Sequence, residues 1–239
     1  MKKLQRKKWK CREIGIEAVH NKGYAYQRKL DTLEEVKKGY FPIKRAIDLV
    51  LSIVLLFLTF PIMFIFAIAI VIDSPGNPIY SQVRVGKMGK LIKIYKLRSM
   101  CKNAEKNGAQ WADKDDDRIT NVGKFIRKTR IDELPQLINV VKGEMSFIGP
   151  RPERPEFVEL FSSEIIGFEQ RCLVTPGLTG LAQIQGGYDL TPQQKLKYDL
   201  TPQQKLKYDM KYIHKGSLMM ELYISIRTLM VVITGEGSR

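Results

Sequence analysis

Two adjacent carboxylates, Asp132 and Glu133, follow a strongly basic stretch in the segment RIDELPQL. At the start of a helix, Asp132 would serve as an N-cap, Glu133 would favour the positive helix end, and Pro135 is tolerated in the first turn. The same pair could do chemistry, because one carboxylate can attack phosphorus while the other binds Mg²⁺, which prefers hard oxygen ligands and substrate phosphates. The residue types alone leave both interpretations open.

Several cationic side chains could serve such a centre. Arg151 lies between Pro150 and Pro152, so its guanidinium is presented from a stiff backbone and suits bidentate phosphate recognition. Lys96 and Arg98 are two residues apart on a predicted strand and would project from one face. With Arg127 and Arg130 they would line either an anion pocket or a merely basic surface.

A long apolar segment, residues 46–72, contains a single charge, Asp48. It exceeds the roughly 18 apolar residues that mark a membrane helix. Pro61 predicts a sharp bend or break after Phe60, and the halves, roughly 20 and 16 Å long, suit a dip into the bilayer and a return. Thr59 could satisfy a carbonyl that the proline frees. Basic residues on both flanks favour the cytoplasm on both sides, and a kinked spanning helix is the alternative.

Composition limits the partners. The chain has 40 Lys and Arg against 25 Asp and Glu, a net charge of +15, which favours nucleic acid, anionic headgroups or phosphate-rich small molecules. No module combines aromatic and basic residues, so we expect no nucleic acid. Cys11, Cys101 and Cys172 are odd in number and far apart, which argues against a disulfide framework or a zinc site.

The predicted fold is mixed α/β and mostly helical, with three parts. Residues 1–40 form a basic arm, either lying on headgroups or solvated; residues 41–73 form the re-entrant helix-break-helix; and residues 74–239 form a small catalytic domain. IYSQVRVG and KLIKIYKLRSM predict a β-hairpin around Gly86 and Gly89. Helices are predicted in 121–130, 132–144, 157–171 and 217–233.

A direct repeat interrupts this plan. TPQQKLKYDL at 191–200 is followed by TPQQKLKYDM at 201–210, which indicates a local tandem duplication rather than a solenoid. Because Pro202 would interrupt a continuous helix, we expect the extra copy to loop out or to start a new helix.

Taken together, these residues resemble the bacterial sugar transferase family of monotopic phosphoglycosyl transferases, which prime capsule, exopolysaccharide and glycoprotein glycan synthesis. The matching elements follow the family order: the proline-broken helix, Gln82 and Arg84 in SQVRVG, KIYKLRSM, GKFIRKTRIDELPQLINVVKGEMSFIGPRP and PGLTGLAQIQG.

The resemblance implies a two-step reaction at the cytoplasmic face of the bacterial inner membrane. Asp132 would attack the sugar-bearing phosphate of a UDP-sugar and release UMP, and undecaprenyl phosphate would then accept the phosphosugar. Glu133, with Asp132, would bind Mg²⁺. Membrane lipids are further partners, and a homodimer is left open. The substrate-binding residues implied are Arg84, Lys96, Arg98, Arg127, Pro150, Arg151, Arg171 and Asp209.

The sequence departs from the family at three places. Phe60 precedes Pro61 where relatives often have serine. Thr175 stands where relatives carry Lys or Arg, so Arg171 is the nearest substitute. The duplication leaves Asp199 or Asp209 as the family's late aspartate, and adjacency to MKYI favours Asp209.

Two alternatives remain at this point. One is the same transfer by direct attack of the lipid phosphate in a ternary complex, with a carboxylate as general base. The other is a non-catalytic basic membrane tether.

Overall fold

The computed structural model describes residues 39–102, 104, 116–185 and 200–234. The predicted basic arm, except its last two residues, and most of the first repeat copy lie outside the described residues. The elements are α3 (Tyr40–Asp73), β1 (Ile79–Val85), η1 (Lys87–Gly89), β2 (Leu91–Leu97), α4 (Asn121–Lys128), η2 (Ile131–Gln136), α5 (Leu137–Lys142), β3 (Ser146–Ile148), α6 (Pro155–Glu164), η3 (Phe168–Leu173), β4 (Gly177–Thr179), α7 (Leu181–Gln185), α9 (Pro202–Lys215) and α10 (Leu218–Thr234). This confirms the mostly helical α/β fold.

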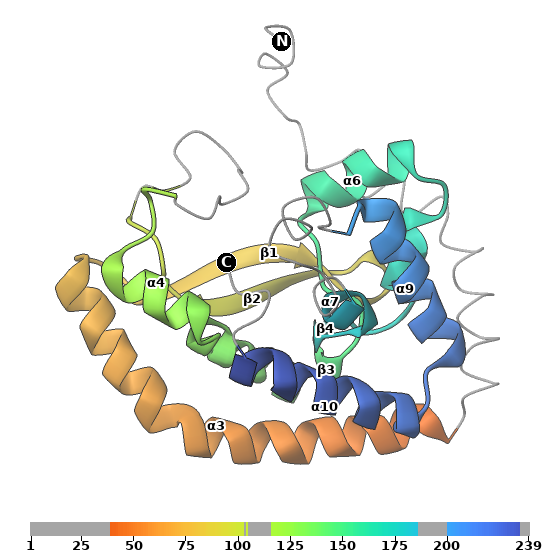
Figure 1. The fold of residues 1–239 in the computed structure, drawn as a ribbon, viewed down its shortest axis with the longest axis horizontal. Coiled ribbons are helices and arrows are strands. Elements are labelled where there is room, and N and C mark those ends of the chain that lie inside the picture. Colours follow the sequence, from red (N-terminus) through yellow and green to blue (C-terminus); the bar gives the residue numbers. More distant parts are fainter. Residues whose placement is uncertain (1–38, 103, 105–115, 186–199, 235–239) are drawn as a thin grey trace, which may run out of the picture.

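The apolar segment forms one uninterrupted helix, α3, so of the sharp bend or break predicted after Phe60 the break is wrong. Pro61 lies inside α3, and Figure 1 shows the helix bending around the lower edge of the domain. A proline removes one hydrogen bond and bends a helix without having to end it. The Thr59 hydroxyl donates to the carbonyl of Leu55 at 2.7 Å, and not to that of Phe57, which Pro61 leaves without a donor.

The first turns of α3 are tied to the domain by polar contacts. Lys44 Nζ lies 2.6 Å from Glu221 of α10, and Arg45 donates to the carbonyls of Val140 and Val141 at the end of α5. Asp48, the one charge of the apolar segment, is 5% exposed and accepts from the amide of Phe147. The start of α3 is therefore fixed to the domain formed by the rest of the chain.

The last turns of α3 return to the same domain. Asp73 accepts from the amide of Val122 at 2.9 Å, and Ile70 packs in a buried cluster with Leu97 and Ile126. Both ends of this long helix thus contact one compact body.

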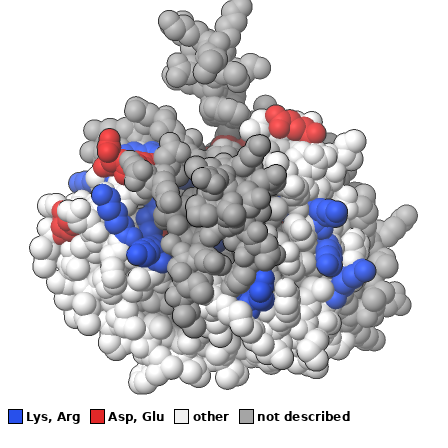
Figure 2. Space-filling model, in the orientation of Figure 1, with Lys and Arg blue, Asp and Glu red and all other residues white. Residues whose placement is uncertain are grey.

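Between its ends, α3 presents apolar side chains to the surroundings. Phe57 is 81% and Ile72 is 79% exposed. Leu222 and Leu229 of α10 are also exposed. Figure 2 shows the rim over α3 and α10 in white, the colour of residues other than Lys, Arg, Asp and Glu. These two helices form the apolar side of the molecule.

The predicted hairpin is confirmed, with β1 and β2 antiparallel from Ile79 opposite Leu97 to Val85 opposite Leu91. Asn139 of α5 ties this hairpin to the carboxylate segment. Its amide, fully buried, donates to the carbonyl of Lys93 at 2.8 Å and its Oδ1 accepts from the amide of Tyr95 at 3.3 Å.

The C-terminal half tests two further predictions, the helix over 157–171 and the start of a helix in the repeat. The helix predicted over 157–171 is divided into α6 and η3, because Gly167 takes a left-handed backbone (φ 83°). The second repeat copy starts the new helix α9, as predicted. Thr201 and Gln204 form a capping box, and Pro202 takes the first helical position, where its missing N–H costs nothing.

Candidate active site

The carboxylate pair lies in η2, a short 3-10 helix that precedes α5. Arg130 takes a left-handed backbone (φ 61°) and caps this helix, and its carbonyl accepts from the amide of Glu133 at 3.1 Å. Asp132 is inside the first turn, so its interpretation as an N-cap is wrong. The turn at Arg130 separates η2 from α4 and directs the pair toward the hairpin.

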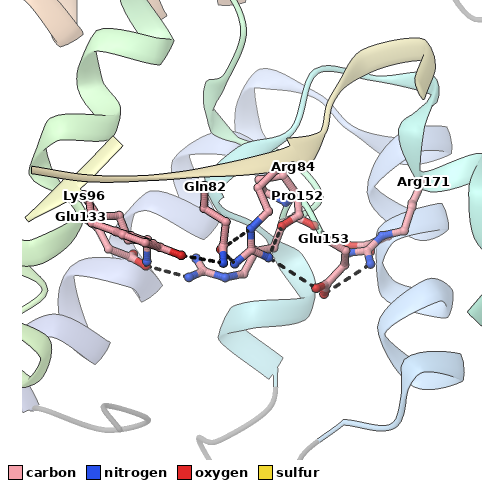
Figure 3. Close-up of polar contacts among 10 residues, drawn as sticks. Gln82, Arg84, Lys96, Glu133, Pro152, Glu153 and Arg171 are labelled. Atoms are coloured by element: carbon pink, nitrogen blue, oxygen red, sulfur yellow. Dashed lines mark hydrogen bonds and ion pairs between the residues drawn. The ribbon is translucent and has the colours of Figure 1, made fainter. Parts of the chain in front are cut away.

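Glu133 is the centre of a partly buried charge cluster. Its Oε1 lies 2.6 Å from Lys96 Nζ on β2 and 2.6 Å from Arg151 Nη2. Lys96 also lies 3.8 Å from Oδ2 of Asp132, which is 7% exposed. The contacts of Glu133 form one end of the chain of polar contacts in Figure 3. Lys96, Arg151 and the carboxylate pair therefore converge in the structure.

Electrostatics separate the two carboxylates. Burial raises the pKa of Asp132, against the attraction of Lys96, Arg151 and Arg127. Burial opposes ionisation of Glu133 too, but Arg151 and Lys96 outweigh it and hold the pKa of that carboxyl well below its usual range. Charges at contact distance in a desolvated site interact far more strongly than in water. Glu133 is thus held as an anion. Asp132 is buried, so its carboxylate is poorly solvated.

The loop that carries Arg151 is held tightly against β4. A side chain on Gly149 would meet the carbonyl of Thr175 at 2.5 Å and the amide of Gly177 at 2.8 Å, so glycine is required by close backbone approach. The two prolines around Arg151 add stiffness, and Pro152 is buried. The interaction with Glu133 raises the pKa of Arg151 further.

Arg84 of β1 lies beside this loop. Its Nε and Nη2 donate to Oε1 of Gln82 at 2.9 and 2.6 Å. Its Nη1 donates to the carbonyl of Pro152 at 3.1 Å and lies 3.8 Å from Glu153. Burial and the positive charge of Arg151 lower the pKa of Arg84 to about 10.

Arg171 of η3 approaches the same loop from the other side. Its Nη2 donates to the carbonyl of Arg151 at 3.0 Å and lies 2.8 Å from Oδ2 of Asp209. Both side chains are buried. Burial raises the pKa of Asp209 to about 6, although Arg171 opposes that shift. The structure thus brings Arg171 and Asp209 together, whereas Asp199 lies outside the described residues.

Arg98 is the predicted site residue that the structure directs elsewhere. Its guanidinium donates to the carbonyls of Ser74 and Pro75, just after α3, and not to the carboxylate pair. Strand β2 ends at Leu97, so the strand alternation that would have kept Arg98 on the same face as Lys96 no longer applies. Arg98 holds the chain where it leaves the apolar helix.

Sequence reasoning missed two residues that organise the site. Glu153 contacts Arg84 at 3.8 Å and Arg171 at 3.6 Å. Asn139 fixes α5, and with it η2, to β2. An acidic residue inside the basic, proline-rich string PRPERP was a signal for Glu153, whereas nothing in the local sequence distinguishes Asn139.

Asp132 and Glu133 are the candidate ligands for a magnesium ion. Within the described part of the chain, no three His, Cys, Asp or Glu side chains group as a metal site. Asp132 and Glu133 supply two carboxylates, and Mg²⁺ is commonly held by one or two carboxylates together with substrate phosphates. Lys96 and Arg151 both contact Oε1 of Glu133. The pair fits a Mg²⁺ completed by substrate.

The chain is similar to proteins of one known family. The bacterial sugar transferase family model matches residues 39–235. The chain is 51% identical to a protein of Bacillus subtilis (strain 168), over 67% of this chain and 84% of the relative. That relative is named as a putative undecaprenyl-phosphate N-acetylgalactosaminyl 1-phosphate transferase. UDP-N-acetylgalactosamine-undecaprenyl-phosphate N-acetylgalactosaminephosphotransferase of Aeromonas hydrophila is 41% identical over 88% of this chain.

Coverage of the relatives differs. The chain spans half of the Aeromonas protein. It spans 71% of UDP-glucose:undecaprenyl-phosphate glucose-1-phosphate transferase of Caulobacter vibrioides (strain ATCC 19089 / CIP 103742 / CB 15), to which it is 38% identical over 82% of its own length. The match of the family model runs from the start of α3 to the end of α10 and includes every element of the site. The chain therefore belongs to the bacterial sugar transferase family.

Proposed function

We propose that this chain transfers a phosphosugar from a UDP-sugar to undecaprenyl phosphate and releases UMP. The observation that carries the proposal is the pair of the buried Asp132 and the partly buried Glu133, on which Lys96 and Arg151 converge. Relatives named as undecaprenyl-phosphate sugar-phosphate transferases support this reaction class. Family membership and the carboxylate pair both favour an enzyme over the basic tether.

In the first step, a carboxylate oxygen of Asp132 forms a bond to the sugar-bearing phosphorus. The bond from that phosphorus to the bridging oxygen breaks, and its electron pair leaves with UMP. In the second step, an oxygen of undecaprenyl phosphate forms a bond to the same phosphorus and Asp132 is released as a carboxylate. A poorly solvated carboxylate suits attack on phosphorus, and cations that converge on the site stabilise the charge that develops.

Arg151 and Lys96 would neutralise the diphosphate, with Arg127 contributing to the field around Asp132. Asp132 and Glu133 would hold Mg²⁺. When bound, the ion supplies Lewis-acid neutralisation of the phosphate oxygens. Glu133 also keeps Lys96 and Arg151 aligned at 2.6 Å in this structure.

The site faces a cytoplasmic donor in this proposal, with α3 embedded in the membrane from that side. A straight helix of 34 residues would be about 51 Å long, well beyond a hydrocarbon core of about 30 Å. Both ends of α3 contact one domain, and its middle exposes apolar side chains. These observations support a re-entrant, monotopic insertion, which brings a soluble donor and a lipid phosphate to one plane.

The central test is UMP release from a panel of UDP-sugars, with undecaprenyl phosphate and Mg²⁺, in detergent or nanodiscs. We expect release with the native chain and a loss of at least about 100-fold in Asp132→Asn and Glu133→Gln, as for other nucleophiles and charge-stabilising groups. Glu159→Gln, at an exposed position on α6, is the control. Release by Asp132→Asn at the native rate would contradict the assignment.

Covalent trapping separates the two mechanisms. Incubation with a UDP-sugar labelled in the sugar, without lipid acceptor, should label the native protein and release one UMP per site. Asp132→Asn should remain unlabelled. Full turnover without any trapped adduct or UMP burst would favour direct attack in a ternary complex.

A further inference from the structure

The loop from Pro150 to Glu153 is bonded at every one of its carbonyls. Four consecutive carbonyl oxygens each accept a hydrogen bond, and two of the four donors are arginine side chains. The bonds run from Gly177 N to Pro150 O (2.9 Å), Arg171 Nη2 to Arg151 O (3.0 Å), Arg84 Nη1 to Pro152 O (3.1 Å) and Val85 N to Glu153 O (2.9 Å).

Glu153 links the two arginines that supply side-chain donors. Its Oε2 lies 3.8 Å from Arg84 Nη1, and its Oε1 lies 3.6 Å from Arg171 Nη1. Figure 3 shows Glu153 between Arg84 and Arg171, with Lys96 and Glu133 at the other end of the same series. The loop is therefore held from two sides by one connected set of charges.

Both arginines donate to groups of the protein, although among the described residues Nε and Nη1 of the buried Arg171 have no hydrogen-bond partner. Arg84 gives Nε and Nη2 to Gln82 and Nη1 to the loop. Arg171 is buried, stacks on Phe168 at 4.9 Å, and uses Nη2 for the loop carbonyl and Asp209. Arg151, by contrast, sends its guanidinium out of the loop to Glu133.

We propose that Arg84, Glu153 and Arg171 form a clamp that fixes the loop so that Arg151 stays aligned with Glu133. This rests on the proposed function, and it makes Arg84 and Arg171 positioning residues rather than substrate contacts. Loops are ordinarily mobile, and a displacement of about 1 Å at a reacting centre can cost about 100-fold in rate. The clamp removes that freedom where Arg151 meets the substrate.

The clamp requires arginine and not merely positive charge. A guanidinium presents donors in a fixed fork, so it can reach a carbonyl and a carboxylate together, whereas a lysine ammonium is a point charge on a flexible stem. Arg84→Lys and Arg171→Lys therefore keep the charge near the loop and remove the paired geometry. Arg118→Lys is a matched control, because Arg118 bonds the carboxylate of Asp116 and the carbonyl of Ala104 in another loop.

The first test is a double-substitution cycle on kcat/KM for UMP release, with Arg151→Lys as the second change. We expect Arg84→Lys alone to lose about 100-fold. In the Arg151→Lys background, Arg84→Lys should cost less than about threefold, because residues that act through one group are not additive. Glu153→Gln should behave like Arg84→Lys, and Glu159→Gln should match the native chain. Fully multiplicative losses would show an independent substrate contact and overturn the proposal.

The second test needs no turnover. Hydrogen exchange of the amides of Val85 and Gly177 reports whether the loop is held, and both should exchange at least about tenfold faster in Arg84→Lys than in the native chain or Arg118→Lys. Unchanged exchange in the variant would overturn the clamp. If the native chain releases no UMP from any donor, the proposed transfer fails, while the exchange result still decides the clamp.

Discussion

Nη2 of Arg171 lies 2.8 Å from Oδ2 of Asp209, and both side chains are buried. Asp209 is the ninth residue of the second repeat copy, and Asp199 is its counterpart in the first. Tyr212 and Ile213, which follow the second copy, are buried in the core. If the first copy took this place, Pro202 and Gln203 would fall at those two core positions. Burial of the following residues therefore selects Asp209.

Substitution at the two aspartates should separate them. Asp209→Asn removes the charge that aligns Arg171 beneath the Arg151 carbonyl, so we expect at least about a tenfold loss of UMP release. Asp199→Asn should change the rate by less than about twofold, because Asp209 and not Asp199 supplies the partner of Arg171. Equal losses in the two variants would show that both copies contribute to the site.

Removing one repeat copy should preserve the enzyme. Deletion of 191–200 joins Leu190 to Thr201 and leaves the helix α9 and its capping box unchanged. Deletion of 201–210 gives the same chain with leucine in place of Met210. We expect both shortened proteins to have the native melting temperature within a few degrees and to release UMP at the native rate or faster. Loss of folding in both would assign the extra ten residues a structural role.

The pH dependence of stability should carry the signature of Asp209. Its folded pKa is raised to about 6 by burial, above an unfolded value of about 3.9. Between these values the folded chain binds more protons, so this group stabilises the fold below about pH 4 and that contribution is lost as pH rises through about 6. Asp209→Asn lacks the titration. The free energy of unfolding of the native chain should therefore fall relative to the variant between pH 4 and 6, and parallel profiles would contradict this.

Asn139 should be important for stability rather than for chemistry. Asn139→Ala removes a fully buried amide and leaves the carbonyl of Lys93 and the amide of Tyr95 without their partner in part-buried hydrogen bonds. A buried group left unpaired costs about 1–3 kcal/mol, so we expect a clear drop in the free energy of unfolding in detergent. Asn121→Ala, at an exposed position on α4, is the control. Equal stability of the two variants would show that α5 is held by other contacts.

Pro61 should decide how α3 lies in the membrane. Pro61→Leu restores the missing backbone donor, favours a straight helix and so favours spanning over return. In a re-entrant chain the residues before α3 stay on the cytoplasmic side. With Pro61 present, a single cysteine introduced at Lys37 should therefore be protected from an impermeant maleimide in spheroplasts. Pro61→Leu should label a measurable fraction, and Phe60→Leu should not. Labelling of the Pro61 chain at Lys37 but not at Lys87 would show a spanning helix.

Local features of the chain were predictable because short-range rules decide them. Strand alternation predicted the hairpin of β1 and β2, and Pro202 predicted that a helix is interrupted there, where α9 starts. The apolar run predicted a membrane helix, but the predicted break at Pro61 was wrong, since a proline bends a long helix without ending it. The N-cap interpretation of Asp132 failed because the left-handed residue Arg130 starts a 3-10 turn.

The sequence by itself determined the carboxylate pair, the cations that could serve it, and the apolar helix, because each depends on residue type and close spacing. Only the tertiary structure decided which of those cations meet. Lys96 and Arg151 are brought to one oxygen of Glu133, whereas Arg98 is directed to the end of α3. These contacts join segments far apart in the chain, and their choice depends on the packing of α5 and the loop carbonyl bonds, which no local pattern encodes.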